Sequence, residues 1–179
     1  NMFKIIDNFL DDDKFNQISH LVKSYDFDWN LTSNLNENSN EDDWQGTHKI
    51  IDEGRLVTST YKSMVDDLVK SLQKIYRKSV SVYRFRVNIF GKYQESRGLG
   101  YHEDILNSDY LSLLLYLENS NGKTEFKNVQ MFDGMKMKTV ESFANRALIF
   151  PARCEHQTLT QTDITFRTNI NMNFVFDNN

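Results

Sequence analysis

The amino-acid sequence predicts a mainly β domain with flanking helices, of the double-stranded β-helix (jelly-roll, cupin-like) fold. Two observations carry this expectation. Apolar residues recur at helical spacing in two stretches before residue 78, and from residue 79 onward they alternate with a period of two, the spacing of strands. The alternating stretches are short, number about seven, and are separated by polar turns. Such strands after two helices favour a closed or double-sheet core with the helices packed outside it.

The first 78 residues are expected to support this core. Residues 3–6 are predicted to form a short strand, and Asp11 is a residue type that caps a following helix. A second, longer helix is predicted over residues 61–76. The apolar stripes would consist of Phe15, Ile18, Leu21 and Val22 in the first helix and of Tyr61, Met64, Val65, Leu68, Val69, Leu72, Ile75 and Tyr76 in the second.

Residues 26–48 are polar and rich in Asn, Asp and Glu, with Trp29 and Trp44 as their large apolar side chains. This composition predicts a long irregular loop. Loops of this length are often lids over a site. The alternative is a solvated surface excursion held down by the two tryptophans.

The core itself is predicted in residues 79–179, and the whole chain, residues 1–179, is expected to be a single domain. The expected strands are 79–90, 110–117, 123–126, 140–143, 147–150, 156–160 and 166–176. Asn121 and Gly122 both tolerate positive φ, so we predict a hairpin turn at this pair.

Composition limits the possible partners and the compartment. The formal net charge of −4 provides no basic field to hold nucleic acid or an anionic membrane. The single cysteine, Cys154, excludes an internal disulfide and a multi-thiolate zinc site. The sequence shows neither a signal peptide nor an apolar run of about 18 residues. We therefore expect a cytoplasmic protein with no membrane partner and no stable nucleic-acid partner.

The most informative segment is Tyr101-His102-Glu103-Asp104. His102 and Asp104 lie on the same side of an extended backbone, whereas the interposed Glu103 points to the other side. His156 follows later, after a predicted strand and a turn. Two imidazoles and one carboxylate suit ferrous iron and leave coordination positions open. We predict His102, Asp104 and His156 as the iron ligands and the catalytic centre, and His20 and His48 as ordinary surface or packing residues.

Two polar residues on predicted strands are candidates for the same site. Arg167 shares one face of the last strand with Asn169, Asn171 and Asn173. That face is either solvent-exposed or the wall of a polar pocket, and an arginine fork matches a carboxylate in such a pocket. Tyr116 lies on an otherwise aliphatic strand, so its hydroxyl needs a partner, either a ligand oxygen or a backbone carbonyl.

The order of these features resembles the Fe(II)- and 2-oxoglutarate-dependent dioxygenases, more closely their prolyl-4-hydroxylase-like branch. The resemblance covers most of the chain. It rests on the His-x-Asp pair at 102–104, on the distal His156 and on Arg167 further along. The stretches 3–10, 114–117 and 122–126 are also similar to family segments. Two features depart from the family: Glu118 stands where an asparagine is more frequent, and the Arg-x-Asn at 167–169 lacks the second arginine of the nucleic-acid demethylases.

The resemblance implies a set of cofactors and roles. Iron would be Fe(II), with 2-oxoglutarate and O2 as co-substrates and ascorbate as an optional reductant. Arg167 would form a salt bridge with the distal carboxylate of 2-oxoglutarate, and the hydroxyl of Tyr116 would bind the same group. The expected contacts with the substrate are Arg86, Asn88 and Trp44, together with the loops 26–48 and 93–100.

The implied activity is hydroxylation of an amino-acid side chain, with peptidyl proline as the first candidate and with release of succinate and CO2. The partner would be a peptide, a protein or a small molecule. Two alternatives remain open. The chain is either a ligand-binding module without catalysis, because a fold does not fix a function, or an oxygenase that acts on a small metabolite or on nucleic acid.

Overall fold

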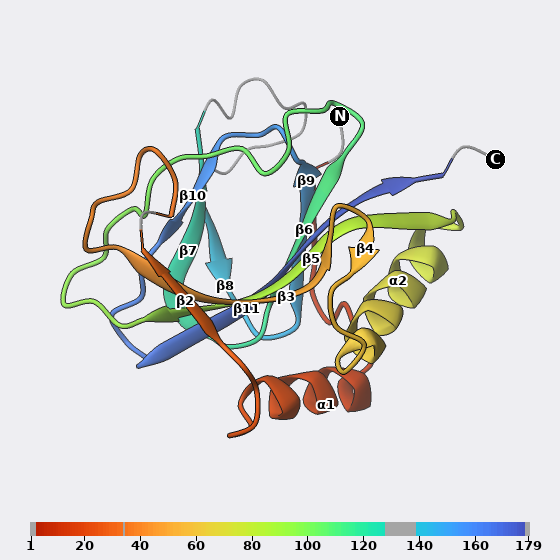
Figure 1. The fold of residues 1–179 in the computed structure, drawn as a ribbon, viewed down its shortest axis with the longest axis horizontal. Helices are drawn as coiled ribbons and strands as arrows, with labels where there is room; N and C mark the ends of the chain where they lie inside the picture. Colours follow the sequence, from red (N-terminus) through yellow and green to blue (C-terminus); the bar gives the residue numbers. More distant parts are fainter. Residues whose placement is uncertain (1–2, 34, 128–138, 178–179) are drawn as a thin grey trace.

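The computed structural model describes residues 3–33, 35–127 and 139–177, and these residues form two helices and two β-sheets (Figure 1). The larger sheet has eight strands and the smaller has three. The two sheets face each other, and the helices lie outside, against the larger sheet. This is the arrangement of a double-stranded β-helix, so the predicted fold class is confirmed.

All strand pairings within the two sheets are antiparallel. The larger sheet consists of β1 (Lys4–Ile6), β2 (Asn30–Ser33), β3 (Trp44–Asp52), β4 (Arg55–Leu56), β5 (Val80–Gly91), β6 (Leu111–Tyr116), β9 (Arg146–Pro151) and β11 (Phe166–Phe176). The smaller sheet consists of β7 (Ser120–Phe126), β8 (Thr139–Ser142) and β10 (His156–Leu159). The order is β1-β9-β6-β11-β5-β3-β2 in the larger sheet, with β4 paired to β3, and β10-β7-β8 in the smaller.

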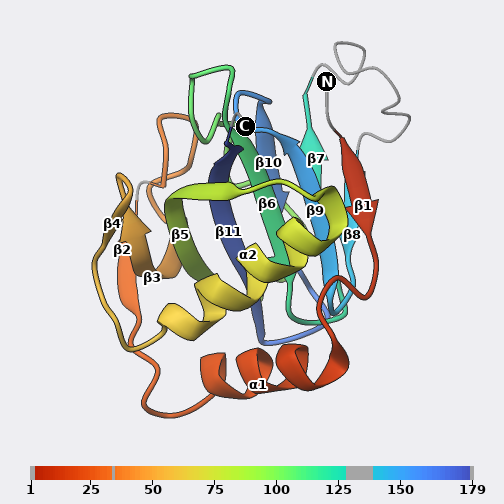
Figure 2. The same ribbon diagram turned by 90° about the vertical axis from the view of Figure 1, so that its right-hand side faces the viewer.

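The helices α1 (Asp12–Val22) and α2 (Lys62–Tyr76) cover the outer face of the larger sheet (Figure 2). Neither of these described helices is long and apolar enough to cross a membrane. The predicted stripe of α2 is confirmed at its buried positions, which are Met64, Val65, Leu68 and Leu72. The prediction that Ile75 belongs to the buried stripe is wrong, because its side chain is 44% exposed. The next residue, Tyr76, packs against Phe176.

The core has two parts, one on each face of the larger sheet. The outer part joins the helices to alternate strand residues, among them Phe85, Val87, Leu113, Leu115, Ile170, Met172 and Phe174. The inner part lies between the sheets and contains Leu114, Tyr116, Phe126, Val140, Leu148, Phe150 and Cys154. Consecutive residues of β6 thus enter different clusters, as the alternation of strand side chains requires.

The predicted helices and strands are present, with small shifts at their ends. The prediction of a single irregular loop over residues 26–48, however, is wrong, because this stretch contains β2 and the beginning of β3. β2 is exposed along its whole length, and β3 pairs with β5 and turns polar side chains such as Thr47 toward Asn88. Neither strand therefore shows the apolar alternation that predicts strands. Residue 34 lies outside the described residues.

The hairpin turn predicted at Asn121 and Gly122 is also wrong, because both residues lie inside β7. The chain turns before them, between β6 and β7, and these two strands belong to different sheets. Gly122 permits a close contact between β7 and a side chain of the other sheet, and it does not form a turn. A Cβ at Gly122 would collide with the guanidinium of Arg167.

Substitution of one buried α2 residue tests this packing. Leu68 is fully buried against the larger sheet, so Leu68→Ala should lower the free energy of unfolding by about 2–5 kcal/mol. Ile75→Ala, on the same helix, should change it by no more than about 0.5 kcal/mol because the side chain is exposed. Urea unfolding followed by circular dichroism measures both. Equal losses in the two variants would contradict the packing of α2.

Candidate metal centre and its cavity

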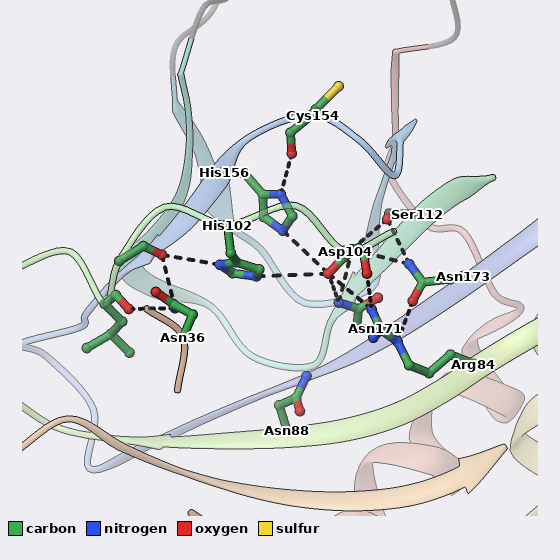
Figure 3. A network of polar contacts seen from close by, with 12 residues as sticks. Asn36, Arg84, Asn88, His102, Asp104, Ser112, Cys154, His156, Asn171 and Asn173 are labelled. Carbon is green, nitrogen blue, oxygen red and sulfur yellow. Dashed lines mark hydrogen bonds and ion pairs between the residues drawn. The ribbon is translucent and has the colours of Figure 1, made fainter. Parts of the chain in front are cut away.

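Three predicted ligands converge between the two sheets (Figure 3). His156 begins β10, and its backbone pairs with that of His102 through two hydrogen bonds of 2.9 Å. Asp104 follows on the same segment, and its Oδ1 lies 3.9 Å from Nε2 of each histidine. All three ligand atoms lie within 4.8 Å of one another. Among the described residues, no other group of three His, Cys, Asp or Glu side chains could hold a metal ion.

Hydrogen bonds fix the tautomer of both histidines. Nδ1 of His156 lies 2.8 Å from the carbonyl oxygen of Cys154, and Nδ1 of His102 lies 3.2 Å from that of Gly100. A carbonyl oxygen only accepts, so each Nδ1 donates its proton and Nε2 keeps a lone pair toward Asp104. Burial lowers the pKa of His156 and favours the neutral ring. Both imidazoles are therefore prepared to bind a metal.

The carboxylate of Asp104 is held by donors from three strands of the larger sheet. Ser112 Oγ donates to Oδ2 at 2.5 Å, and the Nδ2 groups of Asn171 and Asn173 donate at 3.2 Å. Arg84 Nη2 lies 3.5 Å from Oδ1. Burial raises the pKa of Asp104, but the charge of the two imidazoles in their protonated form, Arg84 and the hydrogen bond from Ser112 outweigh it, and the pKa falls to about 2. When the imidazoles are neutral, Arg84 and the hydrogen-bond donors still favour the ionised carboxylate. The third ligand is thus ionised and fixed in direction.

The ligands open into a cavity of about 250 Å³. One wall is a polar ladder on β5 and β11, in which Arg84, Arg86 and Asn88 stand opposite Asn173, Asn171 and Asn169. Of these, Arg84, Arg86, Asn88, Asn169 and Asn171 line the cavity. The polar face of β11 is therefore a pocket wall and not a solvated surface. Arg86 and Asn88, two of the predicted substrate contacts, are among these lining residues.

Trp44 is not among the residues that line the cavity. Its ring lies against Gly91, where a Cβ would collide with it, and the next residue, Gln45, faces the cavity instead. Successive strand residues point to opposite faces, so the strand places Trp44 on the outer side. Glu103 is exposed and also lines the cavity, but it does not belong to the group of three possible metal ligands.

Arg167 is 1% exposed, and its guanidinium lies 5.5 Å from the ring centre of Phe90. Its Nε and Nη1 have no hydrogen-bond partner among the described residues. Burial lowers the pKa of Arg167, because desolvation disfavours the charged form. Glu118 and Asp163 attract its charge, but a buried guanidinium with unpaired donors is costly, so this side chain is suited to receive an anionic group. Phe90 lines the cavity, whereas Arg167 is not among the lining residues.

The Tyr116 hydroxyl is fully buried and forms a 2.6 Å hydrogen bond with Oγ1 of Thr124. Burial raises the pKa of Tyr116 to about 12, so the phenol stays protonated. Thr124 lines the cavity, and sequence reasoning did not single it out as a site residue. The similarity of residues 122–126 to a family segment was the available signal. The same reasoning missed Ser112, whose hydroxyl holds the metal-ligand carboxylate.

Two loops meet at the cavity mouth. Nδ2 of Asn36 donates to the carbonyl oxygens of Leu99 and Gly100 at 3.1 and 3.4 Å, and all three residues line the cavity. An ion pair between Arg97 and Asp43 joins the same two segments. These contacts hold the two segments together beside the metal ligands. Of the other histidines, His48 packs between Phe27 and Tyr61, as predicted for a packing residue.

Comparison with protein-family models and with curated protein sequences gives no match. Solved structures are similar in fold. An oxidoreductase of the 2OG-Fe(II) oxygenase family from Burkholderia pseudomallei has a TM-score of 0.72 at 14% identity, over 98% of this chain and 86% of that one. A prolyl hydroxylase from Trichoplax adhaerens, in complex with a hypoxia inducible factor peptide fragment, has a TM-score of 0.59 at 18% identity, over 98% and 83%.

A non-heme alpha ketoglutarate dependent epimerase from nogalamycin biosynthesis has a TM-score of 0.65 at 9% identity, over 97% of this chain and 78% of that one. At these identities the similarity establishes the double-stranded β-helix fold. The site residues of this chain must carry any argument about its chemistry.

Metal binding tests the centre independently of any reaction. The wild-type protein should bind Fe(II) or Co(II) under nitrogen, and His102→Ala, Asp104→Ala and His156→Ala should each abolish this binding in calorimetric titrations. Ser112→Ala should weaken it by about 10–100-fold, because the ligand carboxylate loses a supporting donor. His20→Ala, an exposed control on α1, should bind normally. Tight metal binding by Asp104→Ala would exclude the assigned triad.

Proposed function

We propose that the protein is an Fe(II)- and 2-oxoglutarate-dependent dioxygenase, which hydroxylates its substrate and releases succinate and CO2. One observation carries the proposal. His102, Asp104 and His156 line a cavity that Phe90 also lines, and the Phe90 ring lies 5.5 Å from the guanidinium of Arg167, a buried cation whose Nε and Nη1 have no hydrogen-bond partner among the described residues. A purely structural metal site would need no such cation. A dicarboxylate that also binds the metal uses both features.

The side chains have separate tasks in this proposal. Arg167 binds the distal carboxylate of 2-oxoglutarate, and the Thr124–Tyr116 pair supports the same group from β7 and β6. Iron, when bound with 2-oxoglutarate and O2, supplies the oxidation of a substrate C–H bond. The contacts of Asn36 with the 99–100 backbone narrow the mouth and help to exclude water from the reacting groups.

We propose an amino-acid side chain as the target, either free or within a peptide. Peptidyl proline is the substrate that the sequence resemblance favours, and the Trichoplax neighbour binds a peptide. The epimerase neighbour belongs to nogalamycin biosynthesis, which supports a small-molecule substrate as the alternative. The net charge of −4 disfavours nucleic acid, because it gives no release of counterions. A reducing, cytoplasmic location is proposed because it would keep the iron ferrous.

Turnover of 2-oxoglutarate distinguishes an oxygenase from a binding module. Under nitrogen, Fe(II) and 2-oxoglutarate should together give a weak visible charge-transfer band, and admission of air should produce succinate. Asp104→Ala should give neither signal and should keep the circular dichroism of the wild type. A protein that binds both components and shows the band but forms no succinate, with any member of a substrate panel, would be a binding module.

Affinity for 2-oxoglutarate tests the role of Arg167. Arg167→Ala should weaken the binding of 2-oxoglutarate by about 2–5 kcal/mol, because a buried charged contact is lost. The affinity for the metal should be retained. Tyr116→Phe should cost only about 0.5–1.5 kcal/mol, the range for one hydrogen bond. Arg55→Ala, an exposed control, should have no effect. Titration of the Mn(II)-loaded protein under nitrogen measures all three.

Gly122→Ala provides a second approach to the same contact. It keeps the charge of Arg167 but displaces its guanidinium, because the added Cβ would occupy the same space. Affinity for 2-oxoglutarate should therefore fall in this variant too. Unchanged affinity in Arg167→Ala would move the carboxylate anchor to Arg84 or Arg86.

A further inference from the structure

A second cationic wall lies in the cavity, and the proposed cofactors do not use it. Arg86 lines the cavity from β5 with a side chain that is 28% exposed, and its Nε is buried without a hydrogen-bond partner among the described residues. Its nearest acidic partner is Asp52, whose Oδ1 lies 3.6 Å from Nη2, beyond hydrogen-bond range. The other oxygen of that carboxylate accepts from Lys49 Nζ at 3.1 Å. Asp52 and Asp104 both attract the charge of Arg86, but among the described residues no acceptor binds its Nε.

Arg84 strengthens the positive charge of this wall. It stands two residues from Arg86, on the same face of β5. Two of its three nitrogens donate hydrogen bonds: Nε to Oδ1 of Asn173 at 2.7 Å and Nη2 to the carbonyl oxygen of Asp104 at 3.1 Å. Arg84 is therefore fixed in place, whereas Arg86 keeps an unused donor beside it. Two neighbouring guanidinium groups favour an anion in the space that they face.

A hydrogen-bond acceptor lies directly across from Arg86. Asn171 is its partner in the β5–β11 register, and it also lines the cavity. Its Nδ2 donates to the Asp104 carboxylate, which only accepts, so the orientation of the amide is fixed. Its Oδ1 is buried and has no partner among the described residues. The wall therefore offers an unused cationic donor and an unused acceptor on adjacent strands.

These groups lie apart from the proposed 2-oxoglutarate anchor. Arg167 pairs with Phe90, four residues along β5 from Arg86, which corresponds to about 13 Å at roughly 3.3 Å per residue. The metal ligand Asp104 is bonded to Asn171 and Asn173, near the Arg86 end of the ladder. A 2-oxoglutarate that extends from the metal toward Arg167 therefore leaves Arg86 and Asn171 Oδ1 free for a second molecule.

We infer that the substrate is a free amino acid, whose carboxylate binds Arg86 and whose amino group donates to Oδ1 of Asn171. This inference rests on the proposed oxygenase function and specifies its substrate. A guanidinium fork matches a carboxylate, and an amide oxygen accepts from an ammonium group. The cavity volume of about 250 Å³ lies below the roughly 300–1,000 Å³ of most drug-sized ligand sites, and 2-oxoglutarate would take part of it, so the substrate that enters it must be small. A residue inside a peptide has neither charged group.

Binding to the assembled protein tests the inference. The protein is loaded with Mn(II) and 2-oxoglutarate under nitrogen and is titrated with the common amino acids, each also as its amide and its N-acetyl derivative, and with a neutral peptide that contains an internal proline. At least one free amino acid should bind, and both of its blocked forms should bind at least tenfold more weakly. The blocked forms separate the carboxylate contact from the amino contact.

Variants of Arg86 connect this preference to the proposed contact. Arg86→Gln should remove the preference for the acid over the amide and leave the affinity for 2-oxoglutarate unchanged. Arg86→Lys, which keeps the positive charge, should retain part of this preference. Arg55→Gln, which removes one exposed positive charge outside the cavity, should behave as the wild type. Retention of the full preference by Arg86→Gln would overturn the inference.

The remaining outcomes separate the two proposals. Equal binding of acids and amides, binding of the peptide alone, or no amino-acid binding by a protein that holds Mn(II) and 2-oxoglutarate would overturn the free-amino-acid inference only. Failure to bind 2-oxoglutarate would overturn the proposed function, and the inference with it.

Discussion

The hydrogen bonds around the Asp104 carboxylate are the interaction on which the site depends. Ser112 on β6, Asn171 and Asn173 on β11 and Arg84 on β5 all reach this one group. A buried carboxylate without such partners would take up a proton and could not bind a metal well. The centre is therefore built into the larger sheet, although two of its three ligands come from an irregular segment.

The two faces of β11 explain how the fold contains so polar an interior. Ile170, Met172 and Phe174 enter the apolar core beneath the helices, whereas the alternate residues face the cavity. The apolar face stabilises the sheet by burial, and the polar face is held by its own hydrogen bonds, such as that between Asn88 and Asn169. Changes in the cavity should therefore affect binding more than folding.

Sequence reasoning succeeded where a pattern follows from local geometry. The period-two segments and the stripe of α2 identified most elements, and the one-residue spacing of His102 and Asp104 identified two members of the group that could hold a metal ion. It failed where contacts between residues far apart in the sequence determine the structure. β2 and β3 are polar strands that exist through pairing with neighbours, and Trp44 faces outward because the register of β3 turns Gln45 inward. Ser112 carried no signal, because its partner lies on another element.

Gly122 shows the same limit at a single position. Asn-Gly is a strong local signal for a turn, yet here the missing side chain makes room for the guanidinium of Arg167, which comes from a strand in the other sheet. The local signal and the tertiary requirement select the same residue for different reasons. The space at Gly122 lets the buried guanidinium of Arg167 lie close to β7, where its Nε and Nη1 have no hydrogen-bond partner among the described residues. A buried cation is costly when its donors stay unpaired, and this cost is the basis for proposing an anionic ligand beside Arg167.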